Sequence, residues 1–354
     1  DITMPTPRHS HTALFFILLF LFPGLASAEF SYDGLVIFGD SLSDAGNKFA
    51  VKGLSNTPPY DLLDPFLVPD GPYSRGGHHH SNGQTWVEQY AKPLDLGDLV
   101  RPALRNPGVA TNYAYGGARA RDASATSDND HFPDQLRSYL ADFGGVASPG
   151  ALHIIFVGGN DIAPDAVFAF AANPVDGLAI LGEAVATIGG AIQTLYAQGA
   201  RKFLVMNSPD LGLTPALAIT DQQFPDALIP PSALASCLSY WFNFGYEMED
   251  PQPAGCPQLP LDLPGLDDVL DMIEAAIPDP TLEIIRYDVY SRFVEMVLYP
   301  RESDPQNGVD PCVMPNIPPY TCKRPADYVF WDGTHPTKAV HGIIADEVGM
   351  LVAD

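Results

Sequence analysis

The sequence predicts an α/β fold in which helices cover both faces of a parallel sheet. Short apolar segments rich in β-branched residues alternate with segments whose apolar residues recur every three or four positions. Strands that alternate with helices form parallel sheets, because the crossover helices lie on the sheet faces. Three of the predicted strands end in polar turns that contain glycine, at 39–41, 116–117 and 158–160. Ligands bind beyond the carboxyl ends of such strands, so these turns mark the expected site.

Five segments have the length and composition of strands. They span residues 35–38, 112–118, 152–157, 202–207 and 282–287. His153, inside the third of them, is expected to be a packed core histidine rather than a metal ligand. The turn after the first strand is expected to place Asp40 and Ser41 at the N-terminus of a helix.

Three segments are predicted helices, at 85–90, 178–195 and 338–351. In the second, apolar residues recur with helical spacing, and Gly199 is a suitable C-terminal cap. The third closes the chain and carries apolar side chains on one face, which are Val340, Ile344, Val348 and Leu351.

The first 28 residues have the pattern of a secretory signal peptide. Arg8 and two histidines precede an apolar run at 13–22, and small residues follow at Ala26-Ser27-Ala28. The run is short for a membrane span, and no later segment is expected to cross a bilayer. The sequence therefore predicts cleavage after Ala28 and a secreted protein, extracellular or periplasmic.

Residues 29–354 are expected to form a single, monomeric domain with insertions around 208–280 and 301–325. Both insertions are rich in proline. The formal net charge of the whole chain is −25. So acidic a surface argues against binding to nucleic acid or to anionic lipid.

All four cysteines lie in the two predicted insertions, at Cys237, Cys256, Cys312 and Cys322. In an exported chain an even number of cysteines indicates disulfides, and four cysteines allow three connectivities. Proximity in the sequence favours pairing Cys237 with Cys256 and Cys312 with Cys322. A zinc site is the alternative, but no C-x-x-C spacing supports it.

The triple histidine at 78–80 lies in a segment rich in Pro, Gly and His. It is a second candidate for metal binding, but adjacent histidines rarely converge on one ion without further ligands. We therefore expect a solvated loop there, and no metal site in the protein.

Ser41 is the candidate nucleophile. It follows a glycine turn after a predicted buried strand, where a rigid scaffold exposes a hydroxyl beside main-chain N–H groups. The alternative is that Ser41 is a simple helix N-cap. Asp40 and Asp44 beside it resemble a glycosidase carboxylate pair, but we expect both to have structural, hydrogen-bonding roles.

A serine hydroxyl needs a base, and the segment 332–335 near the C-terminus supplies one. Asp332 lies three residues before His335, across a glycine, so its carboxylate can fold back and hold the imidazole. The expected oxyanion donors are the main-chain N–H groups of Ser41 and Gly117 and the side-chain amide of Asn160. Gly116 remains an alternative to Gly117.

Four blocks in this order resemble the GDSL family of SGNH hydrolases. They are FGDSLSD at 38–44, NYAYGGA at 112–118, GGND at 158–161 and DGTH at 332–335. The continuation SDAGN at 43–47 is similar to the secreted bacterial branch of phospholipases, lecithinases and haemolysin-like esterases. The resemblance implies a three-layer α/β/α sandwich of flavodoxin type with a five-stranded parallel sheet, and neither metal nor organic cofactor. It also implies the roles given above to Ser41, Gly117, Asn160, Asp332 and His335.

The sequence therefore predicts a secreted serine esterase or lipase whose partner is a lipid ester or another acylated small molecule or glycan. A carbohydrate O-acetylesterase on the same scaffold is the alternative within enzymes. The alternative from another class is a secreted binding protein that has lost turnover. No G-x-S-x-G or H-E-x-x-H motif points to an ordinary α/β-hydrolase or a metalloprotease.

Overall fold

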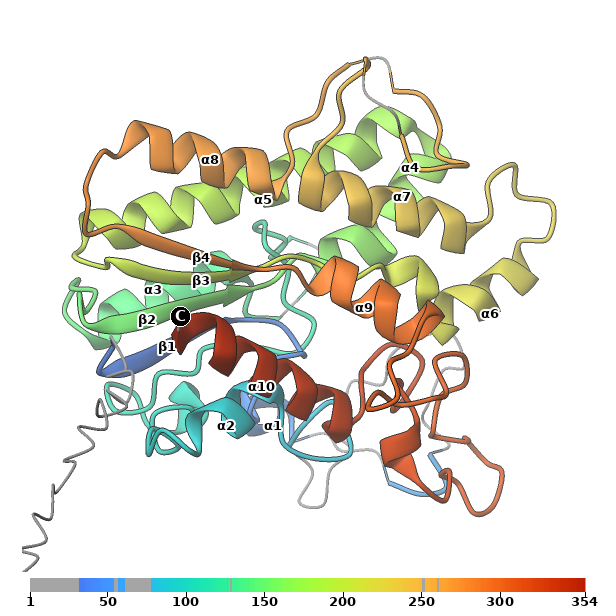
Figure 1. The fold of residues 1–354 in the computed structure, drawn as a ribbon, viewed down its shortest axis with the longest axis horizontal. Coiled ribbons are helices and arrows are strands. Elements are labelled where there is room, and N and C mark those ends of the chain that lie inside the picture. Colours follow the sequence, from blue (N-terminus) through green and yellow to red (C-terminus); the bar gives the residue numbers. More distant parts are fainter. Residues whose placement is uncertain are drawn as a thin grey trace, which may run out of the picture.

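The computed structural model describes residues 32–53, 57–60, 78–125, 127, 129–249, 252–259 and 261–353. The predicted signal peptide, 1–28, lies outside these residues. In the described part, a parallel sheet is sandwiched between two layers of helices (Figure 1). The predicted three-layer arrangement is confirmed.

The sheet has four strands in the order β1-β2-β3-β4, and all three pairings are parallel. The strands are β1 (Gly34–Gly39), β2 (Ala151–Phe156), β3 (Lys202–Met206) and β4 (Glu283–Tyr287). They lie within or next to four of the five predicted strands. The register places Ile37 beside Ile154, and Leu204 beside Ile285.

The prediction of a fifth strand at 112–118 is wrong. The segment runs along the free edge of β1, where Ile37 donates to the carbonyl of Thr111 and accepts from Tyr113 N–H. Continuing this ladder would require Gly39 N–H to donate to a carbonyl of the same segment. It donates instead to Oε1 of Gln135, at 2.9 Å. Half of the next rung still forms, because Tyr115 N–H donates to the carbonyl of Gly39 at 3.0 Å. Without the bond from Gly39 N–H, the segment keeps an isolated bridge and is not a strand.

One face of the sheet is covered by a layer of helices (Figure 1), and their side chains share a hydrophobic core. They are α3 (Phe132–Asp142), α4 (Val167–Ala172), α5 (Pro174–Ala197), α7 (Pro231–Phe244) and α8 (Leu266–Ala276). Val36 and Phe38 of β1 point into this core. Their neighbours Leu35 and Ile37 point into the core on the opposite face, as the strand period of two requires.

The opposite face is covered by α2 (Trp86–Ala91), α9 (Val289–Leu298) and α10 (Lys338–Ala353). Two further helices, α1 (Asn47–Lys52) and α6 (Pro215–Gln223), follow turns at the carboxyl ends of β1 and β3. Short 3₁₀ turns occur at Ala103–Arg105, Leu211–Leu213 and Pro325–Asp327, and a π-helical segment at Asp161–Ala166.

The three predicted helices are confirmed as α2, α5 and α10. On α10 the predicted apolar face is buried except at Leu351, which is 38% exposed near the end of the helix. The prediction of a helix starting at Ser41 is wrong. Residues 41–43 form a turn, and α1 begins only at Asn47, after Gly46 with a φ of 125°.

The expectation that no later segment is apolar enough to cross a bilayer needs correction. By length and composition alone, α5 is long and apolar enough to cross a membrane, although 50% of its most apolar stretch is buried inside the protein. The helix packs against α4, α7 and α8. Its apolar character is that of a core helix, which fills one side of a sheet.

Both predicted disulfides are present: Cys237 pairs with Cys256, and Cys322 with Cys312. The first ties α7 to the loop that follows it. In the second, the N–H of Cys312 donates to the carbonyl of Phe330, and Val313 N–H donates to that of Trp331. The second disulfide thus braces the segment that leads into Asp332.

Gln135 offers a test of the interrupted ladder. Gln135→Met keeps the length of the side chain but leaves the buried N–H of Gly39 without an acceptor. We expect the free energy of unfolding in urea to fall by about 1–3 kcal/mol, because an unsatisfied buried donor keeps its desolvation cost. Gln193→Met, at an exposed position of α5, is the control. Equal stability of the two variants would contradict this account of the sheet edge.

Candidate active site

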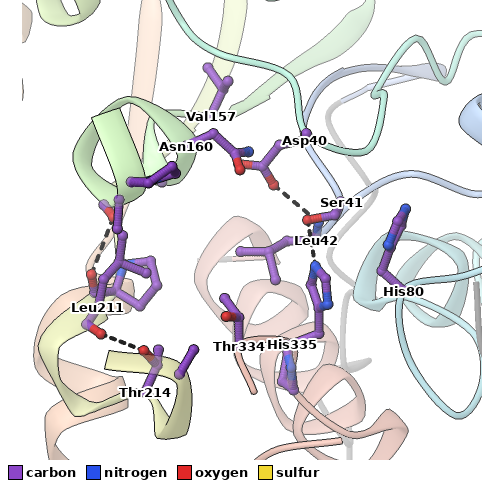
Figure 2. Close-up of a pocket in the computed structure, with 18 of the residues that line it drawn as sticks. Asp40, Ser41, Leu42, His80, Val157, Asn160, Leu211, Thr214, Thr334 and His335 are labelled. Carbon is purple, nitrogen blue, oxygen red and sulfur yellow. Dashed lines mark hydrogen bonds between the residues drawn. The ribbon is translucent and has the colours of Figure 1, made fainter. Parts of the chain in front are cut away.

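The turn after β1 positions Ser41 at the carboxyl edge of the sheet. A Cβ at Gly39 would lie 2.6 Å from the carbonyl oxygen of Phe156, so only glycine lets the strands approach this closely. The carbonyl of Asp40 then accepts the N–H groups of Ser43 and Asp44, at 3.1 and 3.0 Å. This closes the turn and leaves the Ser41 hydroxyl pointing into a cavity (Figure 2).

Asp44 connects this turn to the segment that contains the double glycine. Its carboxylate accepts the main-chain N–H groups of Gly46, Asn47 and Lys48, and that of Gly116 at 2.9 Å. Every one of these bonds holds backbone in place. The structural role expected for Asp44 is therefore confirmed.

A second turn presents Asp332 and His335 from the opposite end of the chain. Oδ1 of Asp332 accepts the N–H groups of Thr334 and His335, at 2.8 and 2.7 Å. Oδ2 lies 2.8 Å from Nδ1 of the imidazole. Both residues are only 2% exposed, so solvent does not compete for these bonds.

The two turns meet at the serine. His335 Nε2 lies 2.8 Å from Ser41 Oγ, across 294 positions in the sequence (Figure 2). Because Nδ1–H donates to Asp332, the lone pair of Nε2 faces the hydroxyl and can accept its proton. The structure brings together the nucleophile, base and acid predicted from sequence.

The three predicted oxyanion donors line the same cavity, whose volume is about 530 Å³. Gly116 N–H is occupied by Asp44, which leaves Gly117 as the donor of that pair. Among the described residues, no acceptor faces the main-chain N–H of Ser41 or of Gly117. Asn160 Nδ2 donates one hydrogen to the carbonyl of Ala118, at 2.9 Å, and retains a second.

The expectation of a solvated loop at 78–80 is wrong, because the three imidazoles pack against separate partners. His78 stacks on Phe49 with ring centroids 4.5 Å apart, and His79 Nε2 lies 2.6 Å from Glu88. His80 is 4% exposed and its ring lies 5.0 Å from that of His335. Within the described ranges, no group of three or more His, Cys, Asp or Glu side chains is placed to hold a metal ion.

Residues 80–82 form a clamp on the histidine turn that the sequence analysis did not identify. The hydroxyl of Ser81 donates to the carbonyl of Pro336 at 2.8 Å, and Asn82 Oδ1 accepts Lys338 N–H at 2.6 Å. With the ring of His80 beside it, His335 is held from both its own turn and this clamp (Figure 2). The only signal in the sequence was a Ser-Asn-Gly turn, which does not indicate the segment that it contacts.

His153 is fully buried in β2, and its ring nitrogens lie 3.3 Å from Tyr139 Oη and from the carbonyl of Lys202. Burial lowers its pKa to about 4. It is a neutral core histidine, as predicted.

The carboxyl of Asp40 faces the cavity beside Ser41 and Asn160 (Figure 2) and is 3% exposed. Burial raises its pKa to about 6, although the N–H of Leu42 and the nearby His335 favour its charged form. Asp40 thus keeps a titratable group next to the hydroxyl while its Oδ1 supports the turn at Leu42 N–H, 3.0 Å away.

A buried Ser-His-Asp chain beside unoccupied N–H donors, at the carboxyl edge of a parallel sheet, is the arrangement of a serine hydrolase. Comparison with known families agrees with this class. The model of the GDSL-like lipase/acylhydrolase family matches residues 35–348. The chain belongs to this family and is a hydrolase that acts on ester bonds.

Some curated relatives match nearly the whole chain, and another matches about half of it. Two GDSL esterase/lipases of Arabidopsis thaliana are each 26% identical to it, one over 91% of this chain and 90% of its own length, the other over 95% and 94%. Lipase 1 of Photorhabdus luminescens is 29% identical over 53% of this chain and 24% of its own length.

The raised pKa of Asp40 predicts how stability depends on pH. The folded state holds the Asp40 proton more tightly than the unfolded chain does, so this group destabilises the fold as pH rises from about 4 through 6. Asp40→Asn keeps the acceptor for Leu42 N–H but carries no charge. At pH 8 we expect the variant to be more stable than wild type by up to about 3 kcal/mol, the equivalent of two pKa units. At pH 3 the two should unfold alike in urea, and an equal difference at both values would contradict the assignment.

Proposed function

We propose that this protein is a secreted serine esterase or lipase that hydrolyses carboxylic esters through an acyl-enzyme on Ser41. The observation that supports this most directly is the hydrogen-bonded chain from Ser41 through His335 to Asp332, with both links at 2.8 Å. The two disulfides support secretion, since such bonds persist in oxidising compartments. We further propose cleavage near Ala28 and a single, monomeric domain with insertions at 208–280 and 301–325.

In the first half of the reaction, Ser41 Oγ attacks the ester carbonyl while His335 Nε2 takes the hydroxyl proton. Asp332 stabilises the imidazolium that forms and holds its orientation. The negative charge on the carbonyl oxygen is met by the N–H groups of Ser41 and Gly117 and by the amide of Asn160. When the tetrahedral intermediate collapses, His335 returns the proton to the departing alcohol.

In the second half, water replaces the alcohol. His335 takes a proton from this water as it attacks the acyl-enzyme, and then returns the proton to Ser41 Oγ as the carboxylic acid leaves. No group other than these side chains and main-chain amides is needed for either half.

The cavity favours a sizeable acyl group over acetyl. Its volume of about 530 Å³ is large for a two-carbon acyl group, and apolar side chains such as Phe168 and Leu217 line it. This supports lipid-like esters ahead of a carbohydrate O-acetylesterase. The complete hydrogen-bonded chain supports an enzyme ahead of a secreted binding protein.

Ser41→Ala and His335→Ala test the assignment of nucleophile and base. Each should lower kcat/KM on p-nitrophenyl esters by about 10⁴-fold or more, because members of such a triad act as a unit. His78→Ala, two residues before the clamp and outside the lining of the cavity, is the control and should retain activity. Thermal unfolding of all variants would be compared with that of wild type. Normal turnover by Ser41→Ala would exclude the acyl-enzyme.

A panel of esters separates the remaining alternatives. Acyl chains from acetyl to palmitoyl, together with phosphatidylcholine, should show a preference for chains longer than acetyl. Activity on acetyl esters alone would favour the sugar esterase. Complete inactivity, with ligand binding unchanged in Ser41→Ala, would favour the binding protein.

A further inference from the structure

The residues that line the cavity of Ser41 differ widely in exposure, and we call its more exposed part the exposed end and its buried part the closed end. At the exposed end, between α4 and α6, Phe168 is 51% exposed. The closed end lies between α9 and α10, where Phe293, Val340 and Ile344 line the cavity and none is more than 8% exposed. A closed end suits a group that terminates there, such as the free end of an acyl chain, whereas the alcohol of a lipid ester carries further substituents.

One side chain at the closed end does not fit a plain hydrocarbon. His341, on α10, lines the cavity between Val340 and Ile344 and is 1% exposed. Neither Nδ1 nor Nε2 of its ring has a hydrogen-bond partner among the described residues. A buried polar group without a partner destabilises the fold, and leucine would fill the same place without that cost. The unpartnered imidazole therefore indicates that a ligand in the closed end forms a hydrogen bond with it.

The protonation state of the His341 ring restricts the chemistry of this occupant. Burial lowers its pKa to about 3, and the nearby His335 and His79 act in the same direction. The ring is therefore neutral, with one nitrogen donating and the other accepting. A hydroxyl can satisfy either nitrogen and is itself neutral. The apolar neighbours require that the rest of the occupant be hydrocarbon.

We propose that the closed end is an acyl-binding subsite that selects acyl chains bearing a hydroxyl, through a hydrogen bond between that hydroxyl and the His341 ring. This rests on the proposed esterase function and adds a substrate class to it, namely esters of hydroxylated fatty acids. His341 is a specificity-determining residue here and takes no part in bond cleavage.

The test compares p-nitrophenyl octanoate with its 2-, 3-, 6-, 7- and 8-hydroxy analogues. In wild type, kcat/KM for at least one hydroxylated ester should exceed that for plain octanoate by about tenfold, the worth of one well-placed hydrogen bond in a buried site. His341→Leu should abolish this preference while keeping activity on plain octanoate. His341→Gln should retain part of it. Met350→Leu, on the exposed part of α10, is the control and should behave as wild type.

The outcomes separate this subsite from the esterase itself. Turnover of plain octanoate with no preference at any hydroxyl position would overturn the subsite alone, and this comparison needs only the wild-type protein. If folded His341→Leu loses activity on plain octanoate and on the hydroxylated esters in equal proportion, this would also overturn the subsite. If no ester is hydrolysed and a fluorophosphonate fails to label Ser41, both the proposed esterase function and the proposed subsite are contradicted.

Discussion

The hydrogen bond between Ser41 Oγ and His335 Nε2 joins two turns that belong to opposite ends of the chain. Each turn is rigid by itself, because a carboxylate accepts main-chain N–H groups within it: Asp44 does so after the serine, and Asp332 does so around the histidine. Their relative position depends on the sheet, which carries the first turn at the end of β1, and on α10, which follows the second. Local hydrogen bonds thus shape the halves of the site, and the packing of a helix layer on a sheet sets the distance between them.

The parts of the fold that could be predicted are those set by local pattern. Four strands and three helices follow from apolar periodicity, and the catalytic candidates follow from glycine turns and from a carboxylate three residues before a histidine. Such features are properties of a few consecutive residues. The disulfide pairs were also accessible, since each closes a short loop of 19 or 10 residues.

The features that could not be predicted depend on contacts between distant segments. Gln135 accepts the N–H of Gly39 in place of the segment 112–118, although nothing near Gln135 in sequence indicates Gly39 as its partner. The helix expected at Ser41 begins only at Asn47, where the carboxylate of Asp44 accepts the main-chain N–H groups of the first two helical residues. The clamp at Ser81 and the orphaned ring of His341 are visible only once α10 lies against the rest of the site.

The distance in sequence between the nucleophile and its base has a consequence for biosynthesis. Ser41 is translated about three hundred residues before His335, and α10 follows the turn that carries His335. A nascent or truncated chain therefore carries an ordinary alcohol with no partner to activate it. Catalytic competence therefore begins only when the segment that carries His335 has been synthesised and has packed beside Ser41.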